Sequence, residues 1–355
     1  MLIRTVQAAD ARPNCRSVDP HASDTRLNTR LLDAIGPQRP TEPLLARRVR
    51  FHQSWYRAAV LGIPQYGHTA GRVQRPMGSV LTDRDALAAR NFTSPCARRL
   101  YERRRLEGWG VDPVRCTKYL TSSQALTLNL LGPLSEYPSW AARVLGRVME
   151  RPDVYEVVRL WVEFAPRRRS QYLDDMTRID ALIEMRTSRG AELLAVEIKY
   201  SDRFNSRQVH IDRRPYRDLA AYTGLWRSVN TALQTPQVNQ LVRCHALATI
   251  MSNDLIGKVS TANLLVVHHT EDRPSRRVAE DYVGYLNDPA IAHVATLDAF
   301  VEALAGTAVE PRERLIAANL RVRYTAESES EAAWRMSGDR SLRVKHRDER
   351  HDSKR

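Results

Sequence analysis

Cysteine and long hydrophobic runs are both scarce in this chain of 355 residues. The four cysteines are Cys15, Cys96, Cys116 and Cys244, and no two of them form a CxxC pair. Their scatter argues against a disulfide framework and a structural zinc site, and it favours a reducing cytoplasm. No segment approaches the roughly 18 consecutive apolar residues of a membrane-spanning helix. No apolar segment follows Met1 either, so we expect neither a membrane span nor a secretory signal.

Motifs of several common enzyme classes are also missing. The chain has no Walker A loop, no HExxH and no GxSxG, so nothing indicates an ATP motor, a zinc protease or a serine hydrolase of the usual kinds. Gly108-Trp109-Gly110 is not a dinucleotide fingerprint, because it lacks a preceding strand and a third glycine. These absences leave the charged residues as the main guide to function.

Positive charge, in contrast, is abundant and unevenly distributed. Lys plus Arg total 55 against 41 Asp plus Glu, a net charge of +14, and only 5 of the basic residues are lysine. Residues 1–120 carry a net charge of +11, residues 121–310 carry −1 and residues 311–355 carry +4. A basic first third suits a polyanion such as nucleic acid. The alternative is that the arginine content reflects coding bias, and charge alone does not decide between the two.

Sequence patterning divides the chain into four regions. They are a loose N-terminal arm (1–43), a basic helical region (44–120), a core (121–310), and a C-terminal helix with a charged tail (311–355). Apolar periodicity predicts helices near 29–35, over 44–62 and over 94–107. From about residue 326 the composition is polar and poor in aromatics, which predicts disorder.

The core region predicts a mixed sheet. Thr121-Ser122-Ser123 caps a helix that we expect to stop at Gly132-Pro133, and a second helix follows over 138–150. The expected strands are 157–164, 178–186, 192–200, 263–268 and a short one at 292–297. The later helices are expected within 216–250, where Thr235-Pro236 separates them, and over 278–286 and 298–305. The first three strands meander and the fourth returns after a helical crossover. This order predicts an α/β fold with a mixed central sheet flanked by helices.

Three charged residues on neighbouring strands have the pattern of a catalytic site. Alternation places Glu197 and Lys199 on one face of their strand, and the tight turn at 187–190 brings Asp180 of the preceding strand beside Glu197. Two adjacent carboxylates repel each other and favour a hard cation, Mg²⁺ or Mn²⁺. An ammonium group beside the cation can stabilise charge during phosphate hydrolysis. Lys199 is the only lysine between residues 119 and 257, although ordinary ion pairs on a half-exposed strand would give the same pattern.

Asp180, followed 17 residues later by Glu197-Ile198-Lys199 on adjacent strands, resembles the PD-(D/E)XK restriction-endonuclease-like superfamily. Ile179 replaces the proline of the motif. The segments TSSQALTLNLLGPL and QVNQLVRCHALA resemble a bacterial restriction-endonuclease-like branch, and the resemblance covers about residues 45–305. It implies an αβββαβ nuclease core at 121–310 with a basic N-terminal helical extension. It also implies Asp180 and Glu197 as metal ligands and Lys199 as the catalytic lysine.

The same resemblance suggests accessory residues. Gln240 and Arg243, one helical turn apart, would point at the site, unless they form a solvated helix face. Gln124 and Ser123 could face it from the helix that begins after Thr121, although capping is the simpler role for Ser123. A leading acid before the strands would be either of two residues, Glu150 or Glu156. Asp174 and Asp175 are rival first ligands in a loop-like run.

Several other residues allow two interpretations. Arg47, Arg48, Arg50 and Arg57 are candidates for gripping nucleic acid. The aromatic residues among them, Phe51, Trp55 and Tyr56, either stack on bases or belong to the core. His268-His269 at the end of a strand is either a metal pair or a polar cap.

Together these features predict a cytoplasmic, Mg²⁺-dependent nuclease that hydrolyses DNA phosphodiester bonds. The alternative is a catalytically inactive DNA-binding module that keeps the nuclease fold. A hydrolase of a small phosphate is disfavoured, because a small substrate does not need so broad a basic surface. A homodimer would allow paired cuts, although the sequence shows no interface signal.

Overall fold

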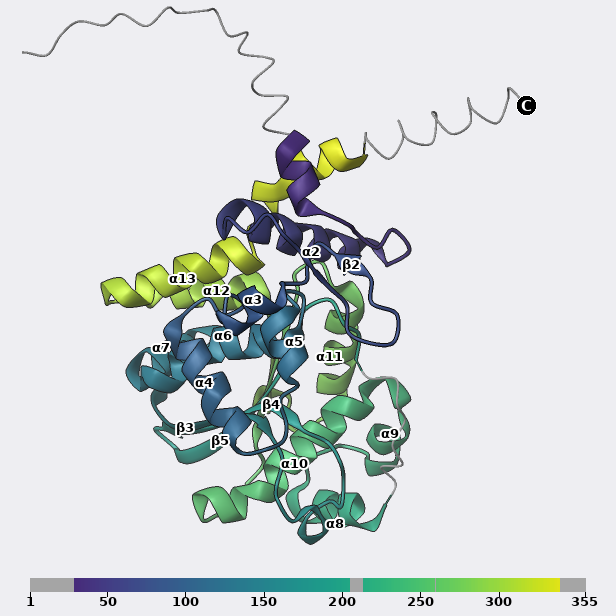
Figure 1. The fold of residues 1–355 in the computed structure, drawn as a ribbon. Coiled ribbons are helices and arrows are strands. Elements are labelled where there is room, and N and C mark those ends of the chain that lie inside the picture. Colours follow the sequence, from purple (N-terminus) through teal and green to yellow (C-terminus); the bar gives the residue numbers. More distant parts are fainter. Residues whose placement is uncertain (1–28, 205–212, 259, 339–355) are drawn as a thin grey trace, which may run out of the picture.

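The computed structural model describes residues 29–204, 213–258 and 260–338, and it has a central sheet between two helical layers (Figure 1). The five strands lie in the order β3-β4-β5-β6-β7. They are β3 (Val154–Phe164), β4 (Ile179–Thr187), β5 (Gly190–Lys199), β6 (Asn263–His268) and β7 (Ala292–Thr296). The first three strands are antiparallel, and β6 and β7 add in parallel to β5. The predicted mixed sheet is therefore confirmed.

Helices cover both faces of this sheet. The longer ones are α2 (Leu44–Trp55), α4 (Pro95–Leu106), α6 (Ser123–Glu136), α7 (Pro138–Val148), α8 (Arg214–Thr223), α10 (Asn239–Ile256), α11 (Arg273–Tyr285), α12 (Leu297–Gly306) and α13 (Pro311–Tyr324). Shorter elements are α3 (Asp83–Leu87), α5 (Pro113–Lys118), α9 (Val229–Gln234) and the hairpin of β1 (Gly67–His68) with β2 (Pro76–Met77). No helix in the described part of the chain has both the length and the apolar character needed to cross a membrane.

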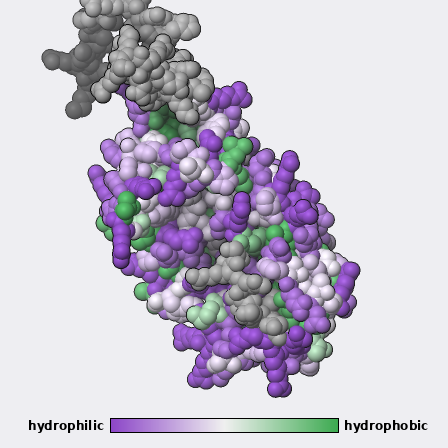
Figure 2. All heavy atoms as spheres, turned by 90° about the vertical axis from the view of Figure 1, so that its right-hand side faces the viewer, coloured by the Kyte–Doolittle hydropathy of each residue, from purple (hydrophilic) through white to green (hydrophobic). Residues whose placement is uncertain are grey.

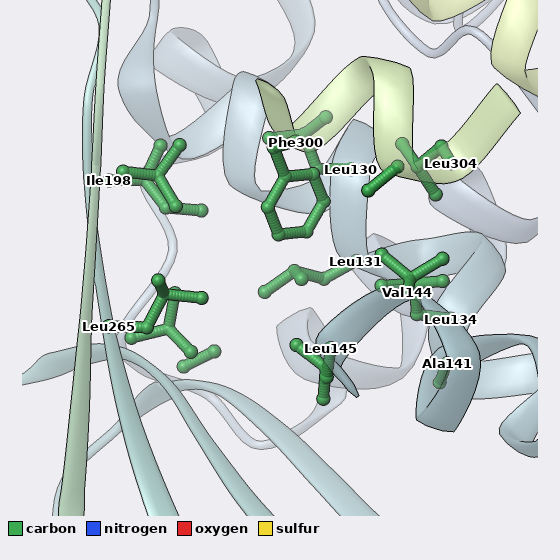
Figure 3. Packing of buried hydrophobic residues seen from close by; sticks show 14 of the residues in the cluster. Leu130, Leu131, Leu134, Ala141, Val144, Leu145, Ile198, Leu265, Phe300 and Leu304 are labelled. Carbon is green, nitrogen blue, oxygen red and sulfur yellow. The ribbon is translucent and has the colours of Figure 1, made fainter. Parts of the chain in front are cut away.

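One face of the sheet packs against α6, α7 and α12. Figure 3 shows Ile198 of β5 and Leu265 of β6 directed toward Leu131 of α6, Leu145 of α7 and Phe300 of α12. The alternate residues of the same strands, such as Leu193 and Ala195 of β5, belong to a second buried cluster with α10. Burial on both faces explains why these strands have continuous hydrophobic runs. It also fixes the register, because a one-residue slip would exchange the two faces.

The basic helical region shares the main hydrophobic cluster of the sheet. Val49 of α2, Leu100 and Tyr101 of α4 and Cys116 of α5 are all buried in it. Phe51, Trp55 and Tyr56, whose roles the sequence leaves open, are core residues of a neighbouring cluster. The outer surface is mainly hydrophilic with small hydrophobic patches, as one side of the molecule shows (Figure 2).

The prediction that Gly132-Pro133 ends a helix is wrong, because α6 continues to Glu136. A Cβ atom at Gly132 would lie 2.5 Å from the Cα atom of Ala97. The glycine therefore allows α4 to pack closely on α6, and this packing stabilises the helix in spite of its internal proline.

The prediction of disorder from residue 326 is wrong for the part that the structure describes. Residues 331–338 are helical and lie beside the predicted helix at 29–35, above α2 in Figure 1. Trp334 contacts Phe51 with a ring-centroid distance of 5.1 Å, and Ala333 is buried in the same cluster. Trp334 and Ala333, together with the ion pair between Glu331 and Arg48, dock this segment on α2. The rest of the predicted tail, 339–355, and most of the predicted arm, 1–28, lie outside the described residues.

Candidate active site

The predicted charged residues meet at one end of the inner strands of the sheet, where β4 begins and β5 ends. This end is called the site edge of the sheet. The antiparallel pairing of Ala181 with Val196, extended by one residue, places Asp180 opposite Glu197. An Asp180 carboxylate oxygen accepts a hydrogen bond of 2.8 Å from the backbone N–H of Ile198. The amino-terminal ends of α6 and α10 border this edge, since Ser123 contacts Asp202 just beyond β5 and Gln240 contacts Glu197.

Glu197, Lys199 and Gln240 form a closed hydrogen-bonded network. The Lys199 ammonium lies 2.9 Å from Glu197 Oε1 and donates to Gln240 Oε1 at 3.2 Å. The amide nitrogen of Gln240 donates to the same Glu197 oxygen. The thiol of Cys244 lies 3.6 Å from the other one. Because Glu197 and Lys199 are buried, this network fixes the directions of both side chains.

Burial and neighbouring charges shift the pKa values of the ionisable groups in the site. Burial, together with repulsion from Glu197 and Glu163, holds the pKa of Asp180 well above its ordinary value. Burial and nearby charge oppose each other at Lys199. Burial lowers the pKa of its ammonium group, but the negative charges of Glu197, Asp180 and Asp202 raise that pKa by more. The lysine therefore stays cationic, while Asp180 holds its proton more tightly than an ordinary aspartate does.

Glu163 on β3 is a site residue that the sequence reasoning missed. The strand pairs Val162–Ala181 and Phe164–Ile179 lie on either side of Glu163. Glu163, Asp180 and Glu197 therefore form a row of three acids across adjacent strands, the acid row. Burial raises the pKa of Glu163 to about 7. The positive charge of Arg178 and a hydrogen bond from Gln124 reduce this increase, and the negative charge of Glu197 adds to it. The sequence contains a signal for Glu163. If the first two predicted strands are paired antiparallel, the residue opposite Asp180 is Glu163.

The two acids proposed from the sequence as leading acids lie elsewhere. Glu150 follows α7 in an exposed position, and Glu156 forms an exposed ion pair of 3.5 Å with Arg186 near the opposite end of β3. The acidic residue that lies beside Asp180 is instead Glu163. The acid comes from the neighbouring strand instead of the neighbouring helix.

The rival ligands and one accessory residue are already paired with each other. Arg243 donates to both carboxylate oxygens of Asp175, with its Nε atom at 2.8 Å, and the Tyr216 hydroxyl donates to Asp175 at 2.6 Å. Asp174 is exposed and pairs with Arg213 at 2.7 Å. Arg243 therefore anchors α10 and does not point at the acid row, whereas Gln240 one turn earlier does.

Gln124 lies between the acid row and the loop that follows α4. Its amide nitrogen donates to the carbonyl of Gly110 at 3.1 Å, and its oxygen accepts from the N–H of Asp112 at 3.1 Å. Its hydrogen bond to Glu163 is one of the influences that lower the pKa of that acid. The hydroxyl of Ser122, and not that of Ser123, caps α6.

The four arginines proposed to grip nucleic acid are largely engaged within the protein. Arg57 is fully buried and donates to backbone carbonyls that include Gly78 at 2.8 Å, so its assignment needs correction. Arg50 forms a bidentate ion pair with Glu42, and Arg48 forms an ion pair of 2.8 Å with Glu331. Arg47 lies over the Trp334 ring at 5.8 Å. These side chains hold α2 to its neighbours, and the helical pattern could not distinguish this from an exposed basic face.

His268 and His269 do not form a metal pair. His268 is buried with its Nδ1 atom 2.8 Å from the backbone oxygen of His269, whose own ring contacts Glu327 at 3.0 Å. They are polar residues that terminate β6 and connect it to the residues after α13.

The donor set in the acid row suits a hard divalent cation. Among the described residues, no three His, Cys, Asp or Glu side chains are already arranged around one metal position. Mg²⁺, however, usually takes only one or two carboxylates from the protein and keeps several waters. Asp180 and Glu197 can supply these two oxygen ligands. Burial, followed by the negative charges of Glu197 and Glu163, raises the pKa of Asp180, and a bound cation would relieve the repulsion among these carboxylates.

Comparison with known proteins agrees with this geometry. The family model described as the PD-(D/E)XK nuclease superfamily matches residues 40–326, which is more than half of the chain. The chain belongs to the PD-(D/E)XK nuclease superfamily. No curated protein and no solved structure matches it significantly. The PD-(D/E)XK match extends from before α2 to beyond α13, so it includes the basic helical region together with the sheet.

Proposed function

We propose that the protein is a Mg²⁺-dependent nuclease that hydrolyses phosphodiester bonds in DNA, with Mn²⁺ as a substitute ion. The observation that supports this most strongly is the convergence of two carboxylates and one ammonium group at a single edge of the sheet. Asp180 and Glu197 oppose each other on β4 and β5, and Lys199 lies 2.9 Å from Glu197. Superfamily membership makes nuclease chemistry the natural use of this set.

The residues have distinct roles in this proposal. Asp180 and Glu197 would hold the cation, which when bound supplies an acidified water and neutralises charge on the phosphate. Lys199 stabilises negative charge on the attacking oxygen, and its raised pKa keeps it protonated at neutral pH. Gln240 accepts from Lys199 and donates to Glu197, so it orients both groups.

The surroundings of the acid row suit an anionic substrate. The amino-terminal ends of α6 and α10 both lie at this edge, and helix amino termini favour negative charge. Arg178, which directly precedes β4, is exposed and lowers the pKa of Glu163. The excess of basic residues in the first third of the chain adds a long-range attraction for a polyanion. The three described cysteines are free and buried, which agrees with a reducing cytoplasm as the proposed location.

A cleavage assay tests this proposal. Purified protein is incubated with supercoiled plasmid, linear duplex and single-stranded DNA, with Mg²⁺, with Mn²⁺ and with a chelator. We expect cleavage of at least one substrate with either metal and none with the chelator. Cleavage that continues in the chelator would contradict the proposed metal site.

A catalytically inactive DNA-binding module is the second candidate. It is favoured by the closed network at Glu197, whose oxygens are already engaged by Lys199, Gln240 and Cys244. Titration calorimetry separates the two candidates. Mn²⁺ uptake that disappears in the Asp180→Asn variant supports the nuclease, whereas DNA binding without any metal uptake supports the inactive module.

A further inference from the structure

A cavity of about 600 Å³ lies beside β3, outside the edge of the central sheet. The end of β3, the loop that follows it, the end of α4 and the last turns of α10 form its walls. Its volume is within the roughly 300–1,000 Å³ that is typical of small-ligand pockets. No residue of the acid row lines it, so it is a separate site.

The lining combines aromatic rings with positive charge. Trp109, Trp161 and Tyr172 contribute rings that are each partly exposed. Four arginines also line the cavity, and three of them are exposed: Arg103, Arg167 and Arg168. The only acidic residue in the lining is Glu107, and it is paired with the fourth arginine, Arg104, at 3.0 Å. The net positive lining favours an anionic ligand that also has a flat, stackable part.

The cavity shares a wall with the proposed active site. Val162 and Phe164 line the cavity, whereas Glu163 between them lies in the acid row. Arg104 donates to the backbone oxygens of Val162 at 2.8 Å and Glu163 at 2.9 Å. A ligand in the cavity is thus separated from the acid row by the backbone of one strand.

The same contacts argue against a peptide as the ligand. β3 is an edge strand, and a peptide could extend the sheet only by pairing with its free backbone groups. The Arg104 guanidinium already occupies two of the carbonyls at this end of β3. Strand addition is therefore blocked where the cavity lies.

We propose that this cavity binds one unpaired nucleotide of a DNA strand whose backbone continues into the active site. The base would lie among the rings of Trp109, Trp161 and Tyr172, and the adjoining phosphates would contact Arg167 and Arg168. A paired base inside a duplex is stacked on both sides and cannot enter such a cavity without being extruded. The choice of DNA as the ligand rests on the proposed function.

Binding measurements without metal test this inference, because no cleavage can then occur. Fluorescence anisotropy compares a labelled single-stranded oligonucleotide with the fully paired duplex of the same sequence, in a chelator. The test variant is Arg167→Ala/Arg168→Ala, which removes two exposed charges from the cavity. The matched control is Arg276→Ala/Arg277→Ala, which removes two exposed charges from α11, beside the opposite sheet edge at β6 and β7.

We expect the wild-type protein to bind the single strand more tightly than the duplex. Arg167→Ala/Arg168→Ala should weaken single-strand binding by about tenfold, since two phosphate contacts are lost. Its effect on the duplex should be no larger than that of the control. Equal effects of the two double variants on the single strand, or a wild-type preference for the duplex, would overturn the inference.

A second readout reports base stacking directly. An oligonucleotide with a single 2-aminopurine should lose fluorescence on binding to the wild-type protein, and Trp161→Leu should weaken its binding by about fivefold or more. If Trp161→Leu fails to fold, the arginine variants still decide the question. The two proposals fail differently: the nuclease proposal fails if Mg²⁺ produces no cleavage while the single-strand preference persists. The cavity proposal fails if DNA is cleaved and the preference is absent.

Discussion

Replacing Glu163 by glutamine should stabilise the metal-free protein at alkaline pH and have a much smaller effect in mild acid. Glu163 is buried in the acid row, and its pKa is raised from 4.5 to about 7. A carboxyl with a raised folded-state pKa binds its proton more tightly in the folded chain than in the unfolded one. Stability is therefore fully present below about pH 4.5 and is lost as the pH rises toward 7.

The size of the effect follows from the two pKa values. Each pKa unit corresponds to about 1.4 kcal/mol. The shift from 4.5 to about 7 thus makes ionised Glu163 destabilising by about 3 kcal/mol at pH 8. At pH 5 the folded wild type holds Glu163 protonated, and the cost falls to about 1 kcal/mol, because only the unfolded carboxyl is then largely ionised.

Urea unfolding in a chelator at pH 5 and at pH 8 measures this difference. We expect Glu163→Gln to unfold at higher urea concentration than the wild type at pH 8, with a difference at pH 5 that is about a third as large or smaller. Glu156→Gln is the control on the same strand, because that side chain is much less buried and pairs with Arg186 at 3.5 Å. Its effect should stay within about 0.5 kcal/mol at both pH values. A gain for Glu163→Gln that is equal at the two pH values would refute the reasoning.

Three further predictions concern the fold. Arg57→Ala should destabilise the protein by about 4 kcal/mol in chemical unfolding, because several buried carbonyls lose their donor; a loss no larger than that of exposed Arg72→Ala would contradict this. Burial lowers the pKa of His245 from 6.5 to about 4, so stability should fall by about 2 kcal/mol between pH 7 and pH 5. His245→Gln should remove that loss, and an unchanged pH dependence would count against it. Gly132→Ala should lower the melting temperature through its clash with Ala97, and an unchanged temperature would show that α4 can move away.

The strands and the three central site residues could be predicted from the sequence because the sheet is strongly specified. Apolar runs mark β5 and β6, short apolar stretches mark β4, and the turn at Gly190 fixes the register between β4 and β5. That register alone brings Asp180 opposite Glu197. Local pattern and tertiary structure therefore agree at this edge of the sheet.

Residues whose roles depend on distant partners could not be predicted. The helical pattern over 44–62 did not show that Arg57 is buried against surrounding loops, whose carbonyls at Gln65 and Gly78 accept its hydrogen bonds. Glu163 was missed because its place beside Asp180 comes from the pairing of β3 with β4, whereas the acid was sought in the helix before the first strand. The helix at 331–338 was missed because a polar composition hides one docking residue, Trp334. In each case tertiary contacts decided the outcome.

Plasmid cleavage by matched variants tests the central claim most directly. Asp180→Asn removes one proposed ligand from the acid row, and Asp174→Asn makes the same change at an exposed aspartate six residues earlier. With Mg²⁺ at neutral pH, Asp180→Asn should cut at least about a hundredfold more slowly than the wild type, whereas Asp174→Asn should cut at the wild-type rate. Cleavage by Asp180→Asn at the wild-type rate would contradict the proposal that this carboxylate holds the catalytic cation.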